Sequence, residues 1–444
     1  MKIKKPIMLF LMIAAFHVNA QQYNVKIDSL IKKAVKLNRF NGSVLVIKNG
    51  KIVFEKGYGY QDAEKKLINT VNTVYQIGST TKEFTAAAII KLMEQNKLSL
   101  DDKVNKYLPA FPHGEEITIK NLLTHTSGLF ELFRDPAFME ADKQQVLSKE
   151  KLLSFFIDKP LYFTPGTEYS YCNSGYVLLG LIIEKVTGKP YEKIINEYFL
   201  KPLKMKHSGF DFQTVSSNQK AKGYIRFTKN KKESSLPWNH TFTYSAGSLY
   251  STVGDLYLWH KGLLNYKVVT KESLEKITTP FLDGYGFGCW IDIVNGKKIV
   301  SHGGNIEGFT SYFGRIQEED ACVILLNNIY NRQIESIGLS IFSILYDKPY
   351  SYYDEIQVNK ELLTTYMGEY EIKTDYHVKI TLDDNRLFIE RPNESKTELF
   401  GMKENAFFEK EEDVMIYFKK DKDAKIQITI TQGLSTKKGD KISK

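Results

Sequence analysis

The chain has 444 residues with a formal net charge of +9, and hydrophobic side chains make up 42% of it. This is an ordinary globular composition, and the length is enough for two or three domains. The charge is mild for this length, and no basic stretch is interleaved with aromatic residues. We therefore predict no nucleic-acid partner.

The first 20 residues have the pattern of a signal peptide. Lysines crowd positions 2–5, an apolar run spans 7–16, and small residues lead to a cleavage site after Ala20. The apolar run is too short to cross a membrane comfortably, and no cysteine near the cleavage site could carry a lipid. We expect an exported protein, periplasmic or secreted, without a stable membrane anchor.

The chain contains three cysteines, Cys172, Cys289 and Cys322. An odd number makes no disulfide framework, and a chain of this length folds without one. We expect small buried thiols, although one pair could bridge after export.

The first predicted elements of the mature chain are a short helix ending near Leu37 and a β-hairpin. The hairpin strands cover 43–47 and 51–54, and Asn49-Gly50 between them is typical of a tight turn. The first strand is apolar at consecutive positions, which indicates that both of its faces are covered.

Next, Gly78 precedes a segment that is apolar nearly all round from Phe84 to Met93 and predicts a buried helix. Ser79 stands at its N-terminus, with Lys82 on the same face about 4.5 Å along the axis. Burial disfavours the ammonium form of Lys82, and the helix N-terminus favours negative charge on Ser79. The pair is therefore a candidate activated nucleophile. Taken alone it also fits an ordinary N-cap, because Ser-x-x-Lys recurs in this lysine-rich chain.

Residues 97–230 are predicted to form a helical subdomain. A helix can start at 98–102 and run toward Leu108, and the apolar segment 176–187 predicts a buried helix closed by Gly188.

Strands return from about residue 240. Hairpins are predicted over 285–301 and 309–326, and a helix with one apolar face follows at 334–345. Strands, a helical insertion and strands again predict an α/β sheet domain over 21–348. Beyond it, short strand patterns at 377–382, 386–390, 414–418 and 425–431 predict a small all-β domain over 355–437. Whether this domain binds a ligand or serves as a spacer stays open.

Tyr171-Cys172-Asn173 lies just before the predicted buried helix. Period-two spacing in an extended segment puts Tyr171 and Asn173 on one side and turns Cys172 away. A Tyr171 phenolate, favoured by the nearby Lys82 cation, could act as a general base, and Asn173 could hold substrate or Lys82. The same residues also fit a polar helix start with a surface tyrosine.

His302-Gly303-Gly304-Asn305 ends a predicted strand. The glycines let backbone approach a ligand, and a backbone N–H here could form an oxyanion hole with that of Ser79. A structural strand-end histidine fits the same pattern. Neither here nor elsewhere does the sequence have metal-ligand spacing, so we predict no metal and no cofactor.

Together, Ser79-x-x-Lys82, Tyr171-x-Asn173 and His302-x-Gly304 resemble the three motifs of class C β-lactamases and related serine DD-peptidases and esterases. Four surrounding segments, 123–129, 163–166, 245–252 and 302–309, are similar to the same family, and the resemblance covers about 25–345. The stretch 366–370 is similar to β-barrel domains appended to some members.

The resemblance implies a β-lactamase/transpeptidase-like antiparallel sheet flanked by helices, plus an all-α subdomain and a barrel-like C-terminal domain. It implies that Ser79 is the nucleophile and that Lys82 and Tyr171 share the proton transfers. Asn173, His302, Gly304 and Asn305 would form the substrate site, with the N–H groups of Ser79 and Asn305 as oxyanion hole.

The expected function is therefore that of an exported serine hydrolase acting on D-amino-acid peptides of peptidoglycan type or on β-lactam-like compounds. His302 stands where β-lactamases carry lysine, which removes a permanent cation that suits a substrate carboxylate. A carboxylesterase and a non-catalytic binding or sensor protein are the alternatives. The partner is a small molecule or peptide, and the oligomeric state stays open.

Overall fold

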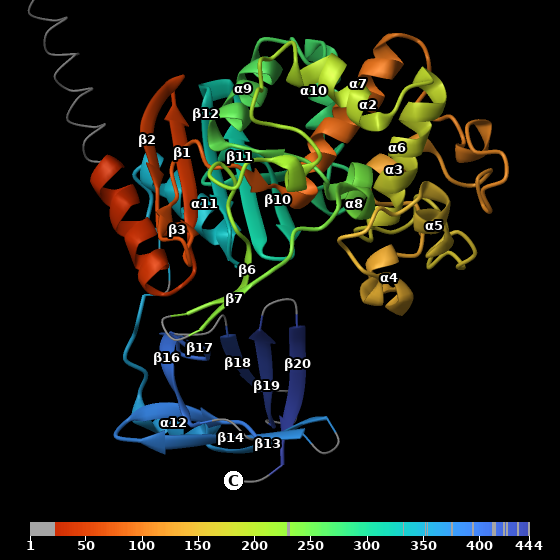
Figure 1. Cartoon of the computed structure of the whole chain (residues 1–444). Coiled ribbons are helices and arrows are strands. Elements are labelled where there is room, and N and C mark those ends of the chain that lie inside the picture. The colour runs from red at the N-terminus through yellow and green to blue at the C-terminus, as the bar shows by residue number, and fades with distance from the viewer. Residues whose placement is uncertain are drawn as a thin grey trace, which may run out of the picture.

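The computed structural model describes residues 23–442 except 229–230, 332, 351, 353, 374–375, 393–394, 411–413, 421, 423–424 and 433–434. An α/β body carries a smaller barrel at its lower end (Figure 1). The predicted signal peptide, 1–20, lies outside the described residues. Within those ranges, no helix is long and apolar enough to cross a bilayer.

The body is built on a six-stranded sheet in the order β2-β1-β12-β11-β10-β9, and every neighbouring pair is antiparallel. Its strands are β1 (Gly42–Lys48), β2 (Lys51–Gly57), β9 (Trp290–Val294), β10 (Lys297–Ile306), β11 (Phe309–Ile316) and β12 (Ala321–Asn327). The predicted hairpin turn at Asn49-Gly50 is confirmed, with both residues at positive φ. The chain returns to the sheet beside its start, because β12 pairs with β1.

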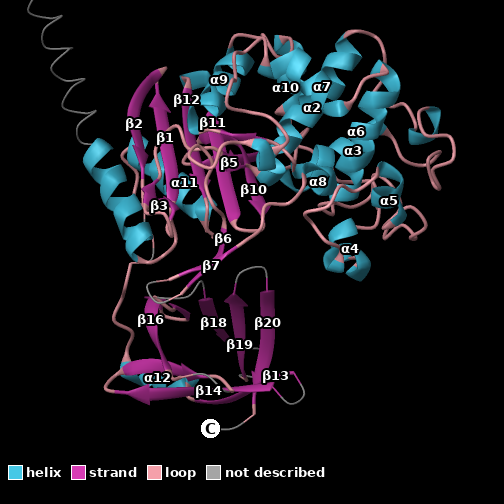
Figure 2. Ribbon diagram, in the orientation of Figure 1, coloured by secondary structure: helices cyan, strands magenta, loops and turns pink. Residues whose placement is uncertain are grey.

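Helices cover both faces of this sheet (Figure 2). Along β1, Val44 and Val46 join the hydrophobic cluster formed with the helix over 23–36 and with α11 (Ile334–Leu345). Leu45 and Ile47 point the other way, into the core that contains α2 (Thr81–Glu94). The prediction that both faces of this strand are covered is confirmed.

The helical side of the body holds the longest buried helices, α2 and α6 (Asn173–Thr187), packed on each other and on α8 (His240–Gly247). Its further helices are α3 (Ile119–Leu123), α4 (Pro136–Glu140), α5 (Lys149–Ser154), α7 (Tyr191–Ile195), α9 (Val253–Leu264) and α10 (Lys271–Ile277). Short strand pairs connect them: β3 (Tyr60–Asp62) with β4 (Leu67–Ile68), β5 (Tyr75–Gln76) with β8 (Tyr250–Ser251), and β6 (Tyr224–Phe227) with β7 (Lys232–Ser234). As predicted, α6 ends at Gly188, which has a φ of 68°.

The helix predicted from 98–102 toward Leu108 is wrong. The Asp102 carboxylate accepts hydrogen bonds from the Ser99 N–H and the Tyr107 hydroxyl, which closes a compact loop. Side chains such as aspartate compete with the helix in this way by bonding nearby groups. Only Val104–Lys106 forms a short 3-10 turn.

The hairpin predicted over 285–301 starts later than expected, because β9 begins at Trp290. The preceding segment crosses α2 so closely that a Cβ on Gly288 would lie 2.6 Å from the Lys82 carbonyl oxygen. Gly288 has a φ of +75°, a conformation that ends regular strand geometry.

The C-terminal strands close into an eight-stranded antiparallel barrel, in which β13 pairs with both β14 and β20. The helix α12 (Lys360–Tyr366) precedes β13 (Gly368–Lys373), β14 (Tyr376–Asp383), β15 (Arg386–Glu390), β16 (Thr397–Lys403), β17 (Ala406–Phe408), β18 (Val414–Lys420), β19 (Ile426–Gln432) and β20 (Ser435–Lys441). The barrel has its own hydrophobic core, which includes Ile389, Ile416 and Ile428. The predicted all-β character of this region is confirmed.

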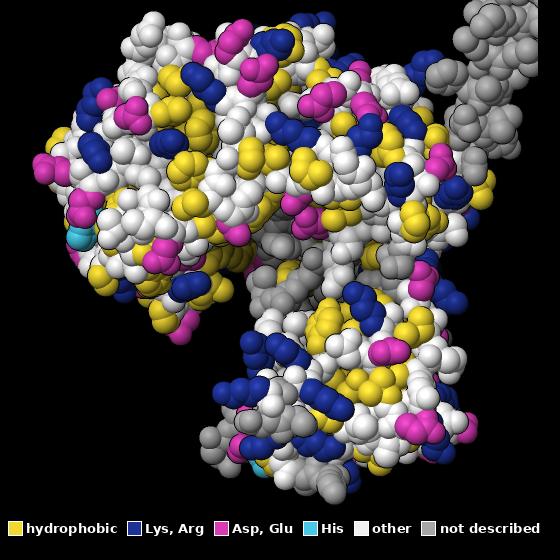
Figure 3. Space-filling model, turned by 180° about the vertical axis from the view of Figure 1, so that it is seen from behind, with side chains coloured by type: hydrophobic (Ala, Val, Ile, Leu, Met, Phe, Trp, Pro, Cys, Tyr) yellow, Lys and Arg dark blue, Asp and Glu magenta, His cyan; other side chains and the backbone are white. Residues whose placement is uncertain are grey.

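The barrel is attached to the body by side chains of both. Phe408 and Met415 of the barrel belong to the hydrophobic cluster of α11 and the first helix. An Arg39 guanidinium nitrogen donates to the Glu409 carbonyl oxygen at 3.1 Å. Seen from behind, the barrel stands below one end of the body and leaves the lower edge of the helical side uncovered (Figure 3).

Candidate active site

Ser79 lies in a 3-10 turn, Gly78–Thr80, that leads directly into α2. The turn is pressed against β10, because a Cβ on Gly304 would lie only 1.9 Å from the Ile77 carbonyl oxygen. That oxygen also accepts a hydrogen bond from the Ser311 hydroxyl at 2.8 Å. Gly304, predicted as a substrate-site residue, therefore fixes the position of Ser79 through the backbone.

Lys82 lies fully buried one turn beyond Ser79. Its Nζ is 3.0 Å from the Ser79 hydroxyl oxygen, 2.7 Å from Asn173 Oδ1 and 2.8 Å from the Ala246 carbonyl oxygen. Burial lowers the pKa of Lys82 to about 7, although the nearby Glu131 carboxylate opposes this shift. Lys82 is therefore available as a base near neutral pH.

The three contacts of Lys82 also define where its lone pair points. Asn173 Oδ1 and the Ala246 carbonyl oxygen can only accept hydrogen bonds. A neutral amine has two hydrogens, and these two acceptors use both. The lone pair then faces the Ser79 hydroxyl, which is the geometry for removing its proton.

Tyr171 and Asn173 approach this pair from the start of α6, and Cys172 points away from it, as the spacing predicts. The Lys82 Nζ lies 4.9 Å from the centre of the Tyr171 ring. Burial raises the pKa of Tyr171, so the expected phenolate is wrong for the free site.

Cys172 lies buried with its thiol directed at the Leu129 carbonyl oxygen, and all three cysteines are free thiols.

His302 lies buried on β10, where its ring is held by two neighbours. Its Nδ1 lies 2.5 Å from the Gly303 carbonyl oxygen and its Nε2 lies 2.9 Å from the Tyr285 hydroxyl. A carbonyl can only accept, so Nδ1 carries the proton and Nε2 accepts from Tyr285. Burial, with the Lys82 charge beside it, lowers the pKa of His302 to about 3. His302 therefore supplies no cation to the site at neutral pH.

Asn305 lies exposed at the end of β10, next to the turn that carries Ser79. A Cβ on Gly78 would lie 2.8 Å from the Asn305 backbone nitrogen. Two backbone N–H groups, those of Ser79 and Asn305, thus belong to segments in direct contact. In the part of the chain that the structure describes, no cluster of three histidine, cysteine or acidic side chains could hold a metal ion.

Comparison with known proteins identifies the family to which this arrangement belongs. A family model described as Beta-lactamase matches residues 27–334. The chain belongs to the beta-lactamase family. Its members are serine hydrolases, and the fold and enzyme class predicted from the sequence are confirmed.

Relatives of this beta-lactamase family protein include Protein flp of Staphylococcus aureus (strain MW2), 32% identical over 77% of this chain and 72% of that protein. The octameric penicillin-binding protein homologue from Pyrococcus abyssi is 29% identical with a TM-score of 0.69, and the match covers 93% of this chain and 99% of the homologue. A D-stereospecific amidohydrolase from Streptomyces sp. is 25% identical with a TM-score of 0.57, over 65% of this chain and 88% of the other.

Glu131, which none of the sequence motifs includes, holds the polar side of the site. One carboxylate oxygen accepts from the Asn173 side-chain amide at 3.1 Å and the other from the Asn173 backbone N–H at 2.5 Å. Glu131 lies just beyond the segment 123–129, which is similar to the beta-lactamase family. An acidic residue beside that motif was the signal from which Glu131 could have been predicted as a site residue.

His125 positions the segment that carries Tyr171. Its Nδ1 accepts from the Cys172 N–H at 3.0 Å, and its carbonyl oxygen accepts from the Ser170 N–H at 2.9 Å. Its ring centre lies 4.2 Å from that of Tyr171. In this beta-lactamase family protein, His125 therefore holds the segment that carries Tyr171 in place.

Proposed function

We propose that the protein hydrolyses amide or ester bonds through an acyl-enzyme on Ser79. One observation carries the proposal: the buried Lys82 Nζ lies 2.7 Å from Asn173 Oδ1, 2.8 Å from the Ala246 carbonyl oxygen and 3.0 Å from the Ser79 hydroxyl oxygen. In the neutral amine the first two acceptors take both hydrogens, and the lone pair is left for the Ser79 hydroxyl. A purely structural lysine has no need of this arrangement.

In the proposed reaction, Lys82 takes the Ser79 proton as the Ser79 oxygen attacks the substrate carbonyl carbon. The N–H groups of Ser79 and Asn305 stabilise the oxygen that becomes negative. The Tyr171 phenol gives its own proton to the leaving nitrogen or oxygen and takes the proton held by Lys82, and the carbonyl–leaving-group bond breaks. Water then repeats the same steps against the ester of Ser79, which releases the acid and restores Ser79.

For the substrate we propose D-amino-acid peptides or amides, supported by the likeness to a D-stereospecific amidohydrolase and to a penicillin-binding protein homologue. The neutral His302 argues against a strong carboxylate anchor at that position, which disfavours efficient β-lactam hydrolysis. An esterase is the second candidate, because a site without that anchor also accepts uncharged esters. Residues 1–20 support export as the setting for these reactions.

The test is the intact mass of the protein after exposure to a β-lactam, an activated short-chain ester and a D-alanyl-D-alanine peptide. We expect an adduct or turnover with the wild type and neither with Ser79→Ala. The compound that reacts chooses among peptidase, lactamase and esterase. A folded wild type that forms no adduct and turns over none of the three compounds would favour the non-catalytic binding protein.

A further inference from the structure

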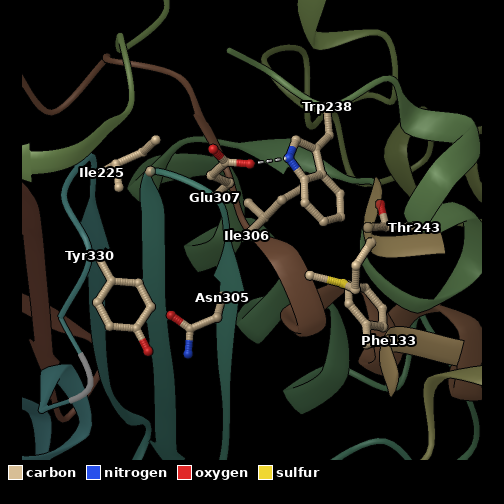
Figure 4. A pocket seen from close by; sticks show the side chains of 10 residues that line it. Phe133, Ile225, Trp238, Thr243, Asn305, Ile306, Glu307 and Tyr330 are labelled. Atoms are coloured by element: carbon tan, nitrogen blue, oxygen red, sulfur yellow. Dashed lines mark hydrogen bonds between the residues drawn. The ribbon is translucent and has the colours of Figure 1, made fainter. Parts of the chain in front are cut away.

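A cavity of about 410 Å³ opens beside Asn305, outside the cluster of Ser79, Lys82 and Tyr171 (Figure 4). Most of its lining is apolar and comes from five separate parts of the chain. Its walls include Phe133, Met139, Ile225, Trp238, Ile306 and Tyr330. A cavity of this size and lining suits an apolar small-molecule group.

The main wall of the cavity is held rigidly. The Trp238 indole N–H donates to the Glu307 carboxylate at 2.8 Å, as Figure 4 shows, and its ring stacks on Phe133 at 6.0 Å between centres. The Trp238 carbonyl oxygen also accepts from the Gln76 side chain at 3.3 Å. Glu307 is thus engaged by the wall itself, and a preformed cavity binds without the cost of ordering its side chains.

Two elements join this cavity to the nucleophile. On β10 and the turn that follows it, Asn305 borders both the Ser79 turn and the cavity, and Ile306 continues into the wall. On α8, Thr243 lines the cavity and Ala246, three residues later, binds Lys82 through its carbonyl oxygen. The cavity therefore begins where the oxyanion-hole segment ends.

The position of Tyr171 decides which part of a substrate reaches the cavity. A leaving group must depart toward its proton donor, which is Tyr171 in the proposed reaction. His302 lies next to Tyr171, with 6.3 Å between the two ring centres, and precedes Asn305 on β10. The cavity is lined by Asn305 and by the residues that follow it. The group that stays on Ser79 is therefore the one that extends into the cavity.

We propose that this cavity is an acyl-group site, and that the enzyme prefers substrates whose acyl part carries a medium-length apolar chain or ring. The inference rests on the proposed Ser79 chemistry and specifies its substrate class. Binding energy from burying an acyl chain beside the reacting carbonyl raises the specificity constant, because the chain stays buried in the transition state.

The experiment compares p-nitrophenyl acetate with p-nitrophenyl octanoate. We expect kcat/KM at least tenfold higher for the octanoate in the wild type, after correction for spontaneous hydrolysis. Met139→Lys places a charge at the cavity, and Met139 is 50% exposed, so the protein tolerates the change. This variant should lose most of the octanoate preference and keep its acetate activity.

The matched control is Leu236→Lys, because Leu236 is 62% exposed and close to Trp238 in sequence but does not line the cavity. It should leave both esters unchanged. Acetate turnover that depends on Ser79 without any octanoate preference overturns the acyl-group site alone. Equal losses on both esters in Met139→Lys do the same. No Ser79-dependent turnover of either ester overturns the proposed chemistry and the acyl-group site with it.

Discussion

Glu131 determines which end of the Asn173 side chain faces Lys82. Glu131 accepts the Asn173 amide hydrogen at 3.1 Å, so the amide oxygen must point to Lys82, which it meets at 2.7 Å. An amide reversed by half a turn would offer Lys82 a hydrogen in place of an acceptor. Glu131 is thus a positioning residue, which acts on Ser79 through Asn173 and Lys82.

We predict that Glu131→Gln lowers kcat/KM by about tenfold and Glu131→Ala by about 100-fold, because small misplacements of catalytic groups are costly. The negative charge of Glu131 raises the pKa of Lys82 against burial, so its removal lowers that pKa further. The pH profile of Glu131→Gln should therefore shift to lower pH. Glu168→Gln, in an exposed loop, is the control for charge removal at a distance. A lower rate with an unmoved pH profile contradicts the charge effect.

The kcat/KM of the free enzyme should rise with pH in a single step centred near pH 7. The pKa of Lys82 is lowered from its ordinary value to about 7, so Lys82 is protonated below that pH and a competent base above it. His302, with a pKa of about 3, is neutral over the whole range and adds no limb. The measurement is kcat/KM from pH 5 to 9 with a neutral ester. A kcat/KM that still rises steeply at pH 9 and does not level off instead means that Lys82 stays charged in the free enzyme.

The positions of those site residues that depend on local sequence pattern could be predicted from the sequence. Gly78 and the apolar run after it indicate a helix start at Ser79, and this places Lys82 correctly. Period-two spacing places Tyr171 and Asn173 on one side. The helix predicted after 98–102 was wrong because the Asp102 carboxylate binds the Ser99 N–H and the Tyr107 hydroxyl and closes a loop there.

Contacts between distant segments were beyond the reach of these patterns. The Ala246 carbonyl, which binds Lys82, is a backbone group 164 residues away, and any residue type can supply it. Tyr285 and Glu131 reach the site only because β10 and α6 bring His302 and Asn173 beside them. The prediction of a phenolate at Tyr171 was wrong because the burial of a side chain, unlike its charge, cannot be read from its neighbours in the sequence.

Gly304 and Gly303 are adjacent on β10 but differ in what surrounds them. A Cβ on Gly304 would lie 1.9 Å from the Ile77 carbonyl oxygen, whereas one on Gly303 meets its nearest atom, the Ser311 carbonyl oxygen, at 3.5 Å. We predict that Gly304→Ala destabilises the fold by about 3 kcal/mol or displaces the Ser79 turn, because backbone cannot yield as a side chain does. Gly303→Ala should change stability by less than about 1 kcal/mol. Urea unfolding of both variants tests this, and equal losses would show that the turn is not pressed on the strand.

Glu83 and Arg315 form a buried ion pair that fastens the nucleophile helix α2 to strand β11. Arg315 Nη1 lies 2.7 and 2.9 Å from the two carboxylate oxygens of Glu83, and the Trp259 indole donates to the same carboxylate at 3.1 Å. Both side chains are almost fully buried, so removing one leaves the other charge without its partner in a medium that solvates it poorly.

We predict that Glu83→Ala lowers the free energy of unfolding by about 3–5 kcal/mol, the range for breaking buried ion pairs. The exposed pair Lys231–Glu233 is the control, and Glu233→Ala should cost less than about 1 kcal/mol. The double variant Glu83→Leu with Arg315→Met should recover much of the loss, because an apolar pair of similar size leaves no charge unpaired. If the double variant is as unstable as Glu83→Ala, the loss comes from packing around Trp259 and not from the uncompensated Arg315 charge.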